Sequence, residues 1–512
     1  MSEISSNNKR IAKNTMMLYV RMFVTMCISL YTSRVILQTL GVEDYGVYNV
    51  VGGFVTMFGI LTTSLSASIS RFVTVELGKG DIERQRAVFS TSIKIQLLMS
   101  LIIIVVAECV GIWFIMNQMQ IPEGRLAAAQ WVFHCSIISF VISLLTVPFS
   151  ATIIAHEHMS AVAYIGILDA ILKLSIVYIL TIVPVDKLIF YAILMVCVHL
   201  LICIIYVIYS KHKFPNSIGY SKFDKKTFKE MWGFAGWSFL GNSAYIFNTQ
   251  GVNMVMNVFF GVVVNAARGI ANQIDSVIFQ FANNFTIAFR PQITKLYAAG
   301  EKTESFILTC RGAKFSFMLM YMIALPIILE IDQILYIWLG TPPENSAKFG
   351  IWAILASLTT TLGNPLLTLI NANGDIKKYQ IYITLVGFLP FPLTWIAYKL
   401  GGSVILAYVI YFIVYYILVY VRLWLVHEKT GIPYSLYLRE AVLRTHLVAI
   451  IALILPLSIT TFIEPSIIRL FVTFVVSVLS NIIACILIGF TMNERKAVFA
   501  KIENIFEKIT KR

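Results

Sequence analysis

Four polar residues recur along one face of a hydrophobic, helix-length segment, and one of them is a cation. Asn265, Arg268, Asn272 and Asp275 are spaced at i, i+3, i+7 and i+10, which places them on the same side of an α-helix. Against lipid these side chains would find no hydrogen-bond partners, so the face must meet protein or water. Arginine can hold phosphate oxygens with paired hydrogen bonds. We therefore expect Arg268, Asn265 and Asn272 to bind an anionic substrate and Asp275 to balance charge or bind a coupling cation.

The preceding hydrophobic segment carries a second polar stripe. Its members fall within an arc of about 80° at 100° per residue and are Asn242, Thr249, Asn253 and Asn257. Two explanations remain open, a dry helix–helix contact in which the amides satisfy one another and a water-filled cavity. Two adjacent striped helices with an arginine among the polar groups favour the cavity, so Asn253 joins the candidate substrate-binding residues.

Three further candidate site residues are ionisable and lie inside hydrophobic segments, where a charge costs about 2.5–3.5 kcal/mol on insertion scales. Arg21 lies about two turns into the first segment and is a candidate substrate-binding cation. Asp169 and Lys173 form an i, i+4 pair in the fifth segment. We expect Lys173 to be a substrate-binding residue and Asp169 a coupling-ion residue, or else the two neutralise each other along one helix face.

The segments that position these residues are membrane spans. Hydrophobic residues make up 58% of the 512 residues and charged residues 13%, whereas a soluble protein has about 45–50% and roughly 25%. The sequence therefore predicts an all-α polytopic membrane protein with about fourteen transmembrane helices of roughly 20 residues each. Their expected ranges are 15–37, 47–69, 89–115, 127–154, 159–183, 187–210, 232–259, 264–288, 308–329, 347–370, 379–398, 403–425, 446–463 and 467–490.

The basic residues give the orientation. With the N-terminus in the cytoplasm and residues near span ends counted with the side that they adjoin, 31 of the 40 Lys and Arg residues fall on the cytoplasmic side and six on the far side. The other three, Arg21, Lys173 and Arg268, lie deeper inside spans. Basic residues near span ends favour the cytoplasm during insertion. The split predicts a multi-pass membrane protein with both termini in the cytoplasm. The net charge of +14 is thus a topology and membrane-lipid signal, and no nucleic-acid partner is expected.

The chain contains an internal repeat. Leu40-Gly41-Val42 returns as Phe260-Gly261-Val262, and two further landmarks recur in the same order, Arg71 with Arg290 and Pro148 with Pro365. Doubling is a recurring plan of secondary transporters, whose substrate path lies between the halves. We expect an N-terminal six-helix lobe (residues 1–220), a C-terminal six-helix lobe (221–430), two extra transmembrane helices (431–492) and a basic amphipathic tail (493–512).

Several functions are excluded by what the sequence lacks. It has no Gly-x-x-x-x-Gly-Lys-Ser/Thr loop for nucleotide binding and no soluble region long enough for a catalytic domain. We expect no enzymatic activity, no catalytic residues, no cofactor and no metal site. The His156 and His158 pair fits a turn better than a metal site.

The stretch from Ser33 to Tyr48, with its core Gly41-Val42-Glu43-Asp44-Tyr45-Gly46, resembles the first-to-second-span signature of the Wzx-type polysaccharide flippases. These belong to the multidrug/oligosaccharidyl-lipid/polysaccharide exporter superfamily. The stretch Gly-Val-x-x-x-Asn-Ala-Ala-Arg that ends at Arg268 is similar to the matching element of the second half.

The resemblance implies a MATE-like fold, two six-helix lobes around a central cavity, with the last two helices flanking a groove for a lipid tail. It implies movement of undecaprenyl-diphosphate-linked oligosaccharide repeat units across the bacterial cytoplasmic (inner) membrane for O-antigen, capsule or exopolysaccharide assembly. Arg21 and Arg268 match in place the cavity arginines of the related lipid II flippases. Polysaccharide polymerase and export machinery are further candidate partners, as is a coupling cation. The alternatives are a cation-coupled multidrug exporter, a lipid II flippase, and a non-transporting membrane scaffold for polysaccharide enzymes.

Overall fold

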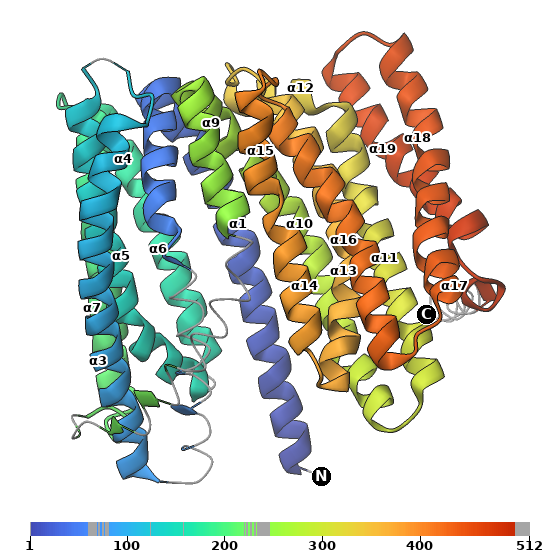
Figure 1. The fold of residues 1–512 in the computed structure, drawn as a ribbon, viewed down its shortest axis with the longest axis horizontal. Helices are drawn as coiled ribbons and strands as arrows, with labels where there is room; N and C mark the ends of the chain where they lie inside the picture. The colour runs from blue at the N-terminus through green and yellow to red at the C-terminus, as the bar shows by residue number, and fades with distance from the viewer. Residues whose placement is uncertain are drawn as a thin grey trace, which may run out of the picture. The chain divides into compact units, whose positions relative to one another are not determined.

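The fold is seen in a computed structural model of the chain (Figure 1). It describes residues 2–59, 81–122, 124–156, 158–219 and 246–496, together with ten single positions within 69–76 and 221–232. The side chains of residues 2–21 and of most of 281–291 lie outside the described part. Asn242 and the tail beyond residue 496 also lie outside it.

Contacts divide the chain into two compact units. The first unit contains residues 1–269 and 391–404, and the second contains residues 270–390 and 405–512. The division falls inside a single helix, α10 (Val262–Ala298). The sequence-based lobes of residues 1–220 and 221–430 were drawn from the repeat and stay a prediction.

Every regular element of the first unit in the described residues is a helix. In chain order they are α1 (Ser2–Thr56), α3 (Ile82–Val106), η1 (Ala107–Gly111), α4 (Ile112–Asn117), α5 (Leu126–Ala155), α6 (Met159–Ile182), α7 (Lys187–Lys213), η2 (Phe247–Gly251) and α9 (Val252–Phe260). The chain returns to this unit at Phe391, at the start of α15 (Pro390–Lys399). In Figure 1, α5 and α7 lie side by side, and α3 packs on α5.

The second unit is helical in the same way. After α10 it contains α11 (Lys302–Leu329), α12 (Ile331–Leu339), α13 (Ser346–Asn373), α14 (Lys377–Phe388), α16 (Leu406–Thr430), α17 (Tyr434–Tyr437), η3 (Leu438–Leu443), α18 (Arg444–Phe462), α19 (Ile467–Ala484) and η4 (Cys485–Gly489). Helix α13 lies between α11 and α16 and is the most buried of these helices.

The described residues contain 11 helices that are long and apolar enough to cross a membrane. The expected fold class, an all-helical polytopic membrane protein, is confirmed. Three expected spans are not among the 11. Residues 47–56 of the segment 47–69 continue the first span within α1, and 60–68 lie outside the described residues. The segment 232–259 is described only in part, and 264–288 lies within α10.

The two repeated glycines adopt the same backbone conformation. Gly41 has φ 82° and ψ 171°, and Gly261 has φ 79° and ψ −176°. This region of backbone space is essentially restricted to glycine because a Cβ would clash there. Each glycine breaks a helical path between two successive spans, so the sequence repeat corresponds to a repeated structural break.

A buried ion pair joins helix α19 to the rest of the second unit. Arg469 near the start of α19 donates to Glu330 Oε2 at 2.7 Å, and Thr473 donates to Glu330 Oε1 at 2.9 Å. Glu330 is 2% exposed, so its carboxylate depends on these donors. Arg469 also donates to the backbone oxygen of Ile463 at 2.9 Å.

A second ionic contact lies where the chain leaves the membrane after η4. Glu494 accepts from Lys314 Nζ at 2.6 Å and from Arg311 Nε at 2.9 Å. Burial by itself would raise the pKa of Glu494. The hydrogen bond and positive charge of Lys314, together with the backbone N–H of Thr491, outweigh burial and hold this pKa below its ordinary value of 4.5. This contact is therefore intact at neutral pH and is lost only on acidification below that value.

We predict that Gly41→Ala lowers the melting temperature of the purified protein, because alanine at this φ and ψ costs on the order of 1–3 kcal/mol. Gly52→Ala is the matched control. It lies in the same helix α1, its φ is not positive, and an added Cβ would meet nothing within 4 Å. A Gly41→Ala protein that melts with the Gly52→Ala control would contradict the strained break.

We predict that Arg469→Ala destabilises the protein by about 3–5 kcal/mol, because it leaves a buried carboxylate without its charged partner. The double variant Glu330→Gln/Arg469→Met removes both charges and should recover most of the loss. Melting temperatures in one detergent compare the variants. If the single and double variants are equally unstable, the ion pair is not the source of the effect.

Candidate functional site

Three asparagines join α9 to the start of α10. The Nδ2 of Asn257 donates to Asn265 Oδ1 at 3.0 Å, and the Nδ2 of Asn265 donates to the backbone and side-chain oxygens of Asn253 at 2.7 and 2.8 Å. All three side chains are buried, and Asn257 and Asn265 are 0% exposed. We call Asn253, Asn257 and Asn265 the amide cluster. The amide cluster can form because the backbone turns sharply at Gly261, which brings α9 and α10 alongside each other.

The amide cluster continues into two other segments of the first unit. The backbone N–H of Gln120 donates to Asn257 Oδ1 at 3.0 Å, and the Gln120 Nε2 donates to the backbone oxygen of Val258 at 2.9 Å. On the opposite side, Asn253 Nδ2 donates to the backbone oxygen of Asn49 in α1 at 3.4 Å. In the described conformation the amide cluster is thus a closed, hydrogen-bonded contact. This is the alternative that the sequence left open, not the water-filled cavity that it favoured.

Small residues allow α1 to approach α9 and α10 closely. A Cβ added at Gly46 would lie 2.1 Å from the backbone oxygen of Val262, and one at Gly269 would lie 3.0 Å from Asn49 Oδ1. Gly46 belongs to the signature stretch after Gly41. The close packing of α1 against Val262, which belongs to the second copy of the repeat, therefore explains why position 46 is a glycine.

Arg268 packs against a π-helical turn. Its Nη2 donates to the backbone oxygens of Asn248 and Thr249 at 3.3 and 3.1 Å, and its Nη1 lies 3.4 Å from Met256 Sδ. Both carbonyls belong to η2, and a π-helical turn disturbs the regular backbone ladder, so its oxygens can accept from side chains. Arg268 is 7% exposed, and these three acceptors are uncharged.

The other two residues of the α10 stripe have different surroundings. Asn272 is exposed, and Asp275 is half-buried. Within the described residues, Asp275 Oδ1 is buried and has no hydrogen-bond partner. A carboxylate oxygen in this state inside a membrane helix is chemically suited to holding a proton or a cation. Asn253 and Asn265 are thus hydrogen-bonded to each other, and Arg268 contacts η2 and Met256 of α9. The hydrogen bonds described above do not include Asn272 or Asp275.

Asp169 and Lys173 pair with each other on α6. Lys173 Nζ donates to Asp169 Oδ2 at 2.7 Å, and both side chains are about one-third exposed. This is the geometry expected of an i, i+4 pair that neutralises itself. Arg21 lies in α1, but its side chain is outside the described part of the structure.

A charged cluster missed by sequence reasoning ties together three turns of the first unit. The Nε of Arg125, just before α5, donates to Asp44 Oδ1 at 2.7 Å, and its Nη1 donates to Asp186 Oδ2 at 2.5 Å. Burial raises the pKa of Asp186, but the bonds from Arg125 and from the first backbone N–H groups of α7 outweigh it, so its pKa lies below the ordinary value. Asp44 belongs to the signature stretch, and its ion pair with Arg125 gives this acid a structural role.

A polar cavity inside the first unit was also missed. It has a volume of about 270 Å³ and lies between α1, α5 and α7. Its polar lining residues are Tyr48, Thr56, Ser136, Ser139, Ser143 and His199. The three serines are spaced at i, i+3 and i+7 on α5, so the helical period was the available signal.

Comparison with known proteins gives one family match and one matching curated relative. The MatE family model matches residues 18–179. The uncharacterized membrane protein EpsK of Bacillus subtilis is 22% identical over 321 residues, a match that spans 61% of this chain and 62% of that relative.

Solved structures resemble the chain over nearly its whole length. A structure of the lipid II flippase MurJ in an inward closed conformation has a TM-score of 0.69 and 14% identity, and the match covers 91% of this chain and 97% of MurJ. An inward-facing multidrug resistance MATE family transporter of the MOP superfamily has a TM-score of 0.64 and 14% identity, covering 81% of this chain and 98% of the transporter. The chain is therefore a multi-pass membrane protein with the helical fold of the MATE and MurJ transporters, which are not enzymes.

Proposed function

We propose that the protein moves undecaprenyl-diphosphate-linked oligosaccharide repeat units across the bacterial cytoplasmic membrane for the assembly of a surface polysaccharide. The observation that carries the proposal is the extent of the structural match. The MurJ match covers 91% of this chain, and the MATE transporter match covers 81%. The larger covered share in the MurJ match is expected if this chain has two helices in addition to its two six-helix lobes.

The extra helices suit a lipid-linked substrate. Outward-facing apolar side chains follow α18 and α19, and among them Ile454 is 60% exposed and Phe471 is 69% exposed. A polyprenyl tail can stay against such a surface while only the headgroup needs a polar path. Moving the headgroup through hydrocarbon unaided would leave each polar group without a hydrogen bond at a cost of several kcal/mol.

Arg268 supplies the charge for this substrate. Three of the acceptors that Arg268 contacts, two backbone carbonyls and a thioether, carry no net charge. A diphosphate offers oxygens at higher charge density, and guanidinium–phosphate bonds are roughly twice as strong as neutral ones. In this proposal the amide cluster closes the path in the described conformation and separates when the substrate passes, which gives Asn253 and Asn265 access to the sugar hydroxyls.

A second candidate function, a cation-coupled exporter of small amphipathic molecules, is favoured by Asp275. Its buried oxygen without a hydrogen-bond partner could bind the coupling ion. Deleting the gene separates the two functions. Undecaprenyl-linked repeat units that accumulate on the cytoplasmic leaflet support the flippase, whereas drug sensitivity without such accumulation supports the exporter.

We predict that Arg268→Gln abolishes complementation of the deletion strain, because glutamine can still donate to the η2 carbonyls but carries no charge. The measurement is the amount of undecaprenyl-linked repeat unit retained on the cytoplasmic leaflet, normalised to protein level and melting temperature. The double variant Asp169→Asn/Lys173→Gln, which removes a pair that already neutralises itself, is the control and should complement. Normal flipping by Arg268→Gln would refute the role of Arg268, and loss of flipping in the control would place Asp169 or Lys173 on the transport path.

We predict that cysteine substitution along α10 gives position-dependent labelling in a cysteine-free background. Asn272→Cys should react with a water-soluble maleimide, since Asn272 is exposed, and Asn265→Cys should react much more slowly while the amide cluster is closed. Reaction half-times in membrane vesicles give the ratio of the labelling rates at positions 272 and 265. If both positions are inert, this face of α10 meets no water and a non-transporting scaffold becomes the better interpretation.

A further inference from the structure

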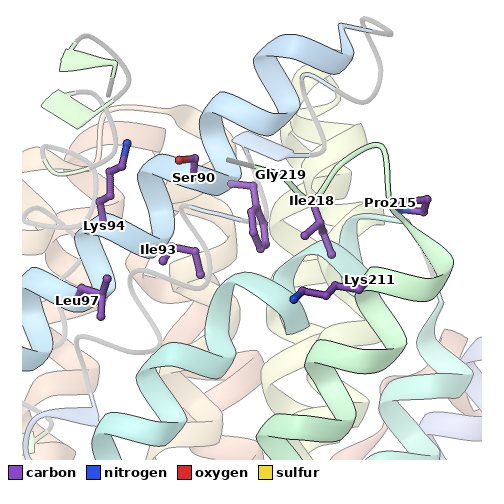
Figure 2. Close-up of a pocket in the computed structure, with 9 residues that line it drawn as sticks. Ser90, Ile93, Lys94, Leu97, Lys211, Pro215, Ile218 and Gly219 are labelled. Atoms are coloured by element: carbon purple, nitrogen blue, oxygen red, sulfur yellow. The ribbon is translucent and has the colours of Figure 1, made fainter. Parts of the chain in front are cut away.

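A pocket lies between the first half of α3 and the chain segment that follows α7. Its volume is about 520 Å³, within the range of about 300–1,000 Å³ that is usual for ligand sites. Figure 2 shows Ser90, Ile93, Lys94 and Leu97 along one side of α3, with Lys211 extending from the end of α7. The remaining lining residues are Phe89, Pro215, Ile218 and Gly219. None of the sequence-based site residues lies here.

Hydrogen bonds hold the wall of this pocket in place. Ser90 Oγ and Lys94 Nζ both donate to the backbone oxygen of Ser221, at 3.0 and 3.1 Å. Arg86 Nε donates to the backbone oxygen of Asn216 at 3.1 Å. The segment after α7 is thus fastened to α3 at two points, and the space between them is part of the fold.

The pocket lies where two lipid-facing stripes end. On α3 the exposed side chains Leu97, Leu101 and Val105 recur every four residues and are 53, 61 and 54% exposed. On α7 Ile208 is 62% exposed, and Lys211 follows it three residues later. Both helices are candidate membrane spans. Each stripe therefore passes from apolar side chains to a lysine, as expected where hydrocarbon gives way to phosphate groups and water.

The charges of the lining are of one sign. It contains two lysines and, among the described residues that line it, no acid. Lysine interacts with phosphate as a compact point charge on a flexible stem, and anionic lipids attract basic residues at the membrane surface. An apolar groove with ammonium groups at its edge has the pattern of a phospholipid, with its acyl chains and a single phosphate.

We propose that this pocket binds an anionic phospholipid of the surrounding membrane. The phosphate contacts Lys94 and Lys211, and an acyl chain passes between Ile93 and Ile218 and then along the α3 stripe. The bound lipid joins α3 to the segment after α7 and so stabilises this end of the first unit. The proposal is independent of the transported substrate.

The test compares lipids and variants on the purified full-length protein. In neutral phosphatidylcholine, added phosphatidylglycerol should raise the melting temperature and remain bound in native mass spectrometry. Lys94→Gln/Lys211→Gln should lower the apparent affinity for phosphatidylglycerol about tenfold or more. Glutamine at position 94 keeps an N–H donor for Ser221. Lys187→Gln/Lys213→Gln is the matched control, because it removes the same charge at positions outside the pocket.

Three results would overturn the proposal. One is equal stabilisation by phosphatidylglycerol in the Lys94→Gln/Lys211→Gln variant and the control. Another is the same stabilisation by water-soluble glycerol phosphate, because the apolar groove would then have no role. The third is a response to an undecaprenyl diphosphate but not to phosphatidylglycerol, which would assign the pocket to a transported lipid. If the double variant does not fold, Lys211→Gln alone is compared with Lys213→Gln.

Discussion

Polar groups inside a bilayer must find their partners within the protein, and this requirement explains most of the specific contacts described above. The amides of Asn253, Asn257 and Asn265 satisfy one another. Arg268 uses carbonyls that a π-helical turn presents, and Glu330 receives two donors from α19. Each contact joins helices that apolar packing alone would leave free to slide, because lipid tails are as apolar as leucine side chains. These few polar contacts thus fix how the helices that they join are aligned along one another.

The sequence predicted the all-helical membrane fold because the length of a hydrophobic segment is a local property. The repeat of Gly41 and Gly261 could be recognised in the sequence alone. The structure explains it, because both residues adopt a backbone conformation that only glycine adopts readily. The spacing of Asn265 and Arg268 correctly placed both on one helix, α10.

The partners of these residues could not be predicted in the same way. Arg125 bonds to Asp44, which is 81 positions away, and Arg469 bonds to Glu330, which is 139 positions away. No periodicity within one helix encodes such pairs. The sequence favoured a wet cavity over a dry contact for the asparagines, whereas their amides bond to one another in the described conformation, because hydrogen-bond geometry decides between the two. The π-helical turn η2 is also invisible to a pattern based on 3.6 residues per turn, since it departs from that period.

The turn η2 has a consequence for how this part of the fold can vary. A π-helical turn accommodates one residue more than the α-helix around it, so the side chains beyond it are rotated by about 100° relative to an uninterrupted helix. The direction of Asn253 and Asn257 in α9 is thus set by the residue count of Phe247–Gly251 as well as by their own positions. A single insertion or deletion there could present a different set of side chains to α10 while both ends of the helix stay in place. In this way a transporter can change the polarity of a contact without changing its scaffold.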